Sequence, residues 1–317
     1  MFNHHLGFDI SMDVLERMIS NLPCLQYLEL VADCKNDVVD GNRWQRQVKY
    51  LSTFKFMFYL NNEIESQGLD SFRTSFWLEE KHWFVGYINR RIFSVPHFLP
   101  TELDENFELV QYSTVPDNRI LYECVNKLQV TERSSPENGY FPHVQTLVIA
   151  CTSFVPTIDK MVDLSRVQHL VFLLSVQNFP TKCLINQMPN LRQISFRCDI
   201  ENFLKQVRYE TFDKIRTLQI GNSFDKVHNF DVAQLSVVFA DVEHLQIDYK
   251  CSPMEMFDFL DRFKHLSTAS FHYISWYESE DMQQYYLDIQ TVLDRVRRVQ
   301  RMNYTYQFDC SSVHFWI

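Results

Sequence analysis

A short pattern of apolar residues recurs along the chain: one apolar residue is followed three positions later by a second, and two positions after that by a third. Leu25, Leu28 and Leu30 form its first instance. From residue 144 onward the instances are regular, and their first residues are Val144, Val167, Leu191, Ile215, Val242 and Leu266. Successive first residues are 23, 24, 24, 27 and 24 positions apart. Self-similarity at such a period predicts a repeat architecture with one structural unit per repeat.

Each repeat is expected to hold one strand and one helical return. The last two apolar positions are two residues apart, so they lie on one face of a short strand. Residues 252–255 (Ser-Pro-Met-Glu) form a capping box with proline at the first helical position. Residues 12–22 and 281–298 carry apolar residues at helical spacing. The pattern therefore predicts a mixed α/β chain, whose last repeat begins at Val299.

Three stretches are distinguished within what we expect to be one continuous domain. Residues 1–60 carry an N-terminal helix and the first repeats, residues 61–120 lack the repeat, and residues 121–317 carry the main array. The middle stretch is rich in aromatic residues, and its segments 81–88 and 91–98 are typical of strands. Two interpretations stay open. The stretch is an insertion that contacts a partner, or it packs its own rings as decayed repeats or covers a sheet edge.

Composition narrows the classes of function. The 317 residues carry a formal net charge of −10, which disfavours general nucleic-acid binding because phosphates are neutralised by basic residues. Only six glycines are present, and no two form Gly-x-Gly. This excludes the phosphate-binding and dinucleotide loops and the Gly-x-Ser-x-Gly nucleophile turn. No nucleophile, base and orienting group can be chosen from the sequence, so we expect neither catalysis nor a cofactor.

The cysteines and the N-terminus bear on the compartment. The eight cysteines are scattered, without a Cys-x-x-Cys pair or zinc spacing, so no metal site is expected. They are typical of buried, reduced thiols in a cytoplasmic or nuclear protein. The first ten residues lack the basic and apolar parts of a signal peptide. The longest apolar run, near residues 167–176, is shorter than the roughly 20 residues that cross a bilayer, so no membrane association is expected.

Two segments carry a family resemblance. Residues 22–30 (Leu-Pro-Cys-Leu-Gln-Tyr-Leu-Glu-Leu) and 188–196 (Met-Pro-Asn-Leu-Arg-Gln-Ile-Ser-Phe) resemble leucine-rich repeats. They are most similar to the degenerate, Phe-rich arrays of F-box/leucine-rich-repeat proteins, the ribonuclease-inhibitor-like class. The resemblance covers residues 125–304 well, 11–60 fairly and 61–120 weakly. It implies an α/β solenoid of horseshoe-like shape, with a curved parallel sheet on the concave face and helices on the convex face.

The resemblance also implies a function. In that family the array recognises a partner protein, and an N-terminal F-box recruits the Skp1/cullin core of a ubiquitin ligase. No F-box is visible before the first helix, so recruitment of that core is expected only if an upstream F-box exists. The expected function is non-enzymatic protein–protein recognition, as the substrate-binding part of a ubiquitin-ligase adaptor. A scaffolding repeat protein without a ubiquitin link is the alternative, and a hydrolase with its site on the insertion is the third.

Candidate site residues follow from the strand positions that flank the last two apolar residues and face the concave surface. The residues expected to bind the partner are Val148, Ala150, Val171, Leu173, Ser195, Arg197, Gln219, Gln246 and Asp248. The first four form an apolar patch, unless the insertion or a missing N-terminal segment folds over it. Secondary candidates are Trp77, Trp83, Arg297 and Arg298. The two arginines also complement the dipole at the end of helix 281–298.

Overall fold

The structure is a computed structural model in which the chain divides into two compact units. Unit 1 comprises Met1–Asn126 and Ser135–His143, and unit 2 comprises Lys127–Ser134 and Val144–Ile317. The described residues are 9–99, 101–103, 110–117, 121–132, 134, 139–151, 157–175, 180–208, 210–221, 231–248, 252–272, 287, 291, 305–308 and 312–317. Both units combine helices and strands, and most strand pairs of unit 2 are parallel. The predicted mixed α/β class is confirmed.

Unit 2 contains a sheet whose strands follow one another in sequence order. They are β7 (Lys127–Val130), β8 (Thr146–Ile149), β9 (His169–Phe172), β10 (Gln193–Phe196), β11 (Thr217–Gly221), β12 (His244–Asp248) and β13 (Thr268–His272). Each pairs in parallel with the next. Equivalent positions of the predicted repeat lie opposite one another, as Leu170, Ile194 and Leu218 do. The repeat read from the sequence therefore sets the strand register.

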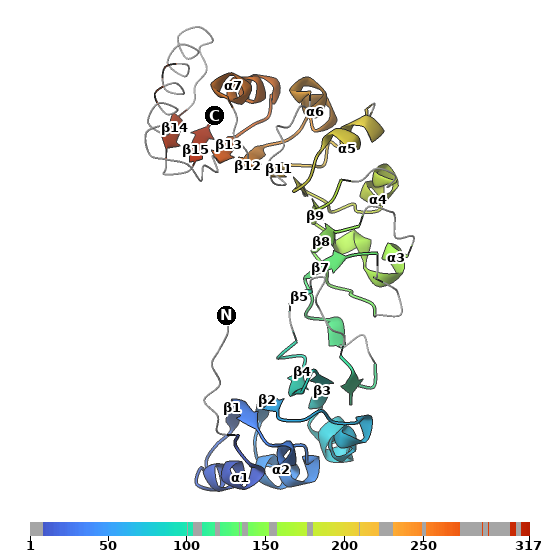
Figure 1. The fold of residues 1–317 in the computed structure, drawn as a ribbon, viewed down its shortest axis with the longest axis vertical. Helices are drawn as coiled ribbons and strands as arrows, with labels where there is room; N and C mark the ends of the chain where they lie inside the picture. The colour runs from blue at the N-terminus through green and yellow to red at the C-terminus, as the bar shows by residue number, and fades with distance from the viewer. Residues whose placement is uncertain are drawn as a thin grey trace. The chain divides into compact units, whose positions relative to one another are not determined.

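Helices cover one face of this sheet. They are α3 (Ile158–Met161), α4 (Thr181–Asn186), α5 (Glu201–Gln206), α6 (Val232–Val238) and α7 (Pro253–Arg262), with a 3₁₀ turn at Leu164–Arg166. In Figure 1, α4 to α7 lie along one side of the strands. Strand and helix phenylalanines pack between the two layers, with Phe203 of α5 6.0 Å from Phe172 and 4.7 Å from Phe196 (ring centroids). The predicted capping box of Ser252 and Glu255 is present at the start of α7.

The end of the sheet differs from the prediction. The strand beside β13 is β15 (Ser312–Trp316), which runs antiparallel to it, and β14 (Thr305–Phe308) pairs antiparallel with β15. A final parallel repeat beginning at Val299 was expected there. Residues 299–304 lie outside the described residues, as does the predicted helix 281–298 apart from Leu287 and Thr291, which are helical. The C-terminal hairpin thus pairs with β13 where a further repeat was expected.

Unit 1 begins with two strand–helix repeats. Its elements are α1 (Met12–Ser20), β1 (Tyr27–Cys34), a 3₁₀ turn (Asn36–Val38), α2 (Gly41–Val48), β2 (Thr53–Leu60), a 3₁₀ helix (Ser66–Phe72), a π-helix (Phe76–Glu80), β3 (Phe84–Ile88), β4 (Arg91–Val95), β5 (Glu102–Leu103) and β6 (Tyr112–Ser113). Strands β1 and β2 pair in parallel. Beyond them the order β2-β4-β3-β6 is antiparallel. The two strands predicted in residues 81–98 are therefore present as a hairpin that covers the edge of β2.

The aromatic residues of unit 1 form its core. Trp77, a secondary candidate for partner contact, is fully buried, and its Nε1 donates to the Gly41 carbonyl oxygen at 3.2 Å. Trp83 is half-buried, with its ring 6.0 Å from those of Phe54 and Trp77. The partner-contact interpretation is wrong for Trp77, because a side chain without exposed surface cannot touch a partner. Trp83 belongs to the same cluster, so its ring packs against the chain's own aromatic residues.

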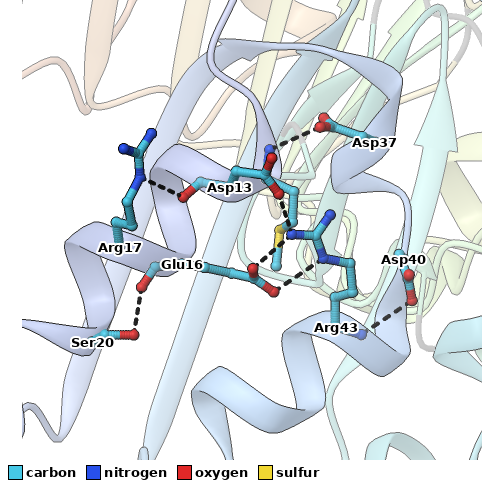
Figure 2. A network of polar contacts seen from close by, with 8 residues as sticks. Asp13, Glu16, Arg17, Ser20, Asp37, Asp40 and Arg43 are labelled. Atoms are coloured by element: carbon cyan, nitrogen blue, oxygen red, sulfur yellow. Dashed lines mark hydrogen bonds and ion pairs between the residues drawn. The ribbon is translucent and has the colours of Figure 1, made fainter.

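An arginine fork joins the two N-terminal helices (Figure 2). Arg43 of α2 donates from Nε to Glu16 Oε1 at 3.0 Å and from Nη2 to Glu16 Oε2 at 2.6 Å. The same Nη2 lies 2.6 Å from Asp13 Oδ1. The hydrogen bonds and charge of Arg43 hold the pKa values of the Asp13 and Glu16 carboxyls below their usual range. This two-pronged geometry fixes α1 against α2.

The fork predicts a pH-dependent effect for Arg43→Met. At pH 7 we expect the variant to unfold at a lower urea concentration than the wild type. A carboxyl whose pKa is lowered by folding stabilises the fold above its unfolded pKa, and this contribution is lost as the pH falls through the folded value. The difference should therefore shrink below about pH 4. Circular dichroism during urea unfolding measures it, with Arg17→Met as the control because Arg17 donates to a backbone oxygen of its own helix. An equal difference in stability between variant and wild type at pH 7 and below about pH 4 would contradict the fork's role.

Candidate functional site

The face of the unit 2 sheet opposite the helices carries a row of polar side chains, and we call this face the open face. Residues at one register position run across it in the order Val148, Val171, Ser195, Gln219, Gln246, Ser270 and His314. Leu170 and Phe172, which flank Val171 in β9, are fully buried on the opposite face. Alternation along each strand therefore separates a helix-packed apolar side from an open side that is largely polar.

Four hydrogen bonds connect side chains across β9 to β12. His169 Nε2 lies 2.7 Å from Ser195 Oγ, and Ser195 Oγ donates to Gln219 Oε1 at 3.1 Å. Gln219 Nε2 donates to Asp248 Oδ2 at 2.7 Å. Gln246 Nε2 donates to Asp248 Oδ1 at 2.8 Å. The chain of bonds ends at the Asp248 carboxylate.

The direction of these bonds follows from the acceptor at their end. An ionised carboxylate only accepts, so the Gln219 amide turns its nitrogen toward Asp248 and its oxygen toward Ser195. Ser195 uses its single hydrogen for that oxygen, and His169 must then donate from Nε2. Burial lowers the pKa of His169 to about 4, assisted by the positive charges of Arg197 and Lys127. His169 is therefore a neutral ring with its proton on Nε2.

This tautomer predicts how His169 affects stability. Between pH 6.5 and about 4 the unfolded ring binds a proton and the folded ring does not, so this residue makes the fold less stable as the pH falls. His169→Gln offers an amide donor and does not titrate. We expect its free energy of unfolding, measured in urea, to fall less than that of the wild type between pH 6.5 and 4. His265→Gln is the control because His265 is exposed. A parallel loss in wild type and His169→Gln would contradict the assignment.

The C-terminal hairpin extends the open face beyond β13. His314 contacts Ser270 Oγ through Nδ1 and Ser312 Oγ through Nε2, both at 2.8 Å. Trp316 is 45% exposed and lies two residues further along β15, with its ring 6.3 Å from that of His314. Trp316 and His314 are not among the residues predicted from the sequence. The alternation Ser-Val-His-Phe-Trp at residues 312–316 was the available signal, but it does not reveal which strand they join.

The predicted site residues differ in accessibility. Val148 and Val171 are only 4% and 7% exposed, so the exposed apolar patch expected there is wrong for both. The neighbouring strands lie about 4.8 Å away on either side, so their side chains cover these short branched groups from solvent. Ser195 is 1% exposed because its hydroxyl lies within the hydrogen-bonded chain. Ala150 and Leu173 are half-buried.

Six of the predicted residues lie where a partner could contact them, and Ala150 and Leu173 are the two apolar ones. Arg197 is exposed, and Gln219, Gln246 and Asp248 are partly exposed. The hydrogen bonds described above bring the last three together across β11 and β12. Arg297 and Arg298 lie outside the described residues. The accessible part of the predicted site therefore includes a polar surface that carries one positive charge, on Arg197, and one negative charge, on Asp248.

Ser195 and His169 have the spacing of a nucleophile and base but not the geometry. The Ser195 hydrogen points to Gln219, the His169 nitrogen facing it is a donor, and the hydroxyl is buried. A general base needs a free lone pair on that nitrogen. Among the described residues, no group of three His, Cys, Asp or Glu side chains is arranged to hold a metal ion. The described side chains of the open face can bind a partner through hydrogen bonds and charge.

None of the helices in the described part of the chain has both the length and the apolar composition that a bilayer span requires. No protein-family model matches the chain. No curated protein is significantly similar to it. The fold is a mixed α/β chain of stacked strand–helix repeats, and in unit 2 the described helices α4 to α7 lie on one face of the sheet.

Proposed function

We propose that the chain is a non-enzymatic protein-recognition module that binds its partner on the open face of unit 2. The hydrogen-bonded set Ser195–Gln219–Asp248–Gln246 carries this proposal. Its polar groups are held in one orientation before any partner arrives, which reduces the ordering cost of binding. Trp316 on β15 and Arg197, directly after β10, are residue types that often dominate binding energy.

The finer fold proposed is a leucine-rich-repeat solenoid with a horseshoe-like curve. Parallel strands in register, one per two dozen residues, and helices on a single face support it. The resemblance of residues 22–30 and 188–196 to the family motif supports it as well. The location proposed is the cytoplasm or nucleus, supported by the buried, free thiols of Cys34, Cys151 and Cys198.

The function as a ubiquitin-ligase adaptor rests on the family resemblance. If the full protein carries an F-box, its capture from cells should recover Skp1 and cullin subunits together with the open-face partner. The present chain alone is expected to recover the partner without those subunits. Recovery of no ubiquitin-ligase subunit by a chain with an F-box would contradict the adaptor function and leave recognition by the open face intact.

Two charge reversals test recognition by the open face. Arg197→Glu changes an exposed cation on the open face, and Lys205→Glu changes an exposed cation on α5, where Lys205 pairs with Glu201 at 2.7 Å. We expect Arg197→Glu to reduce partner recovery about tenfold, which is 1.4 kcal/mol of binding energy. Lys205→Glu should leave recovery unchanged. Quantitative mass spectrometry after affinity capture measures both, with urea unfolding as the check on folding.

Equal recovery by the two variants would place the partner elsewhere on the chain. Loss of recovery with Lys205→Glu alone would place the partner on the helical face and overturn the proposal.

A further inference from the structure

Asp248 differs from three paired carboxylates of unit 2, Glu210, Glu201 and Asp258, in what holds it. Glu210, Glu201 and Asp258 each have a lysine or arginine nitrogen within 2.7 Å. Asp248 is held by two neutral amide donors instead. In the described part of the chain its one potential cationic neighbour is His272, whose Nε2 lies 3.9 Å from Oδ1. The carboxylate is therefore fixed in position without a permanent positive charge beside it.

Its side chain also remains accessible. One fifth of the Asp248 side chain is exposed, at 20%. The two amides occupy one acceptor position on each oxygen, and each oxygen has a second. An arriving ammonium or guanidinium group could therefore bind without breaking the existing bonds. Hydrogen bonds between a cation and a carboxylate are about twice as strong as those between neutral groups.

Arg197 borders the same region from the other side of β11. Gly221 lies directly opposite Asp248 in the sheet. A Cβ placed on Gly221 would lie 3.7 Å from Asp248 Oδ2 and 3.8 Å from Arg197 Cγ. The glycine adds no side chain between the two charged residues, and no ion pair between them is present among the described residues. Their strands, β10 and β12, are two strand spacings apart, about 10 Å.

We propose that Asp248 binds a lysine or arginine side chain of the protein partner and that Arg197 binds an aspartate or glutamate side chain. The partner segment thus carries a basic and an acidic side chain about 10 Å apart, lying across β10 to β12. This inference rests on the proposed function because it specifies what the open face recognises. Complementary charge selects the partner, and the hydrogen-bonded chain behind Asp248 keeps the carboxylate from turning away.

The probe for this proposal is a library of random peptides displayed on phage and selected on the immobilised full chain. Open-face binders are those that protect His244 and His272 from carbethoxylation and leave His265 reactive. We expect them to contain a basic and an acidic residue. Asp248→Asn should weaken them about tenfold, and Asp258→Asn on α7 should not. Exchanging the peptide's basic residue for glutamine should weaken binding to the wild type and have no further effect on Asp248→Asn.

A second double-mutant cycle combines Arg197→Gln with exchange of the peptide's acidic residue. We expect the peptide exchange to weaken binding to the wild type and to have no further effect on Arg197→Gln. Open-face binders without coupling to Asp248 or Arg197 would overturn this inference and leave the proposed function standing. Selection of no peptide that protects His244 and His272 would count against both. Unfolding curves of the variants show whether a lost signal reflects a lost fold. The peptide-side substitutions, tested on the wild-type chain, remain informative in that case.

Discussion

Trp77→Ala is expected to destabilise unit 1 by about 3–5 kcal/mol, the range measured when large buried aromatics are truncated. The indole is fully buried against Phe54, Phe72 and Phe76, so its removal leaves a cavity. It also leaves the Gly41 carbonyl oxygen without its Nε1 donor. Urea unfolding followed by circular dichroism, which does not depend on the tryptophan signal, measures the loss.

The matched control is Tyr50→Ala in the same unit, where the side chain is 80% exposed. A change of less than about 0.5 kcal/mol is expected there. If Trp77→Ala were as stable as the wild type, Trp77 would have to be exposed, and the interpretation that the aromatic stretch contacts a partner would be supported.

Val171→Asp is expected to destabilise unit 2 by at least about 3 kcal/mol, because a carboxylate loses its hydration when it is buried without a partner. Val171 lies between Val148 and Ser195 on the neighbouring strands and is 7% exposed. An exposed apolar patch would instead predict a folded variant that fails to bind. The free energy of unfolding and partner recovery, measured on the same preparation, separate the two outcomes.

Leu174→Asp is the control for this substitution. Leu174 follows the same strand by two residues and is 41% exposed, so the new carboxylate stays hydrated. A stability within about 0.5 kcal/mol of the wild type is expected. A normally folded Val171→Asp protein would show that the open face near β8 and β9 is accessible.

The stacking of the repeats could be predicted because every repeat contains a strand whose apolar face must be buried against its neighbours. A strand with two apolar residues on one face is stable only when its neighbours bury that face. The periodic placement of Leu170, Ile194 and Leu218 therefore determines both the strand and its register. The same alternation correctly assigned Gln219, Gln246 and Asp248 to the open face.

Features that depend on distant pairing left no such periodic signal. The hairpin of β3 and β4 covers β2, and β15 pairs with β13 in the antiparallel direction, so both depart from the repeat. The exposure of residues on the open face could not be predicted either. The pattern in β9 shows which way Val171 points but not how far its neighbours cover it from solvent. The hydrogen-bonded chain required both the register and the rotamers of residues from four repeats.

Carbethoxylation of histidines in the presence and absence of the partner tests the central claim most directly. His244 and His272 lie on the open face, and His265 lies in the turn before β13, with its Nε2 3.8 Å from Asp241 Oδ1 in the turn before β12. All three are at least partly exposed, so each provides a rate that mass spectrometry can follow. Recognition by the open face predicts that bound partner slows modification of His244 and His272 and leaves His265 unchanged. Protection of His265 with unchanged rates at His244 and His272 would contradict it.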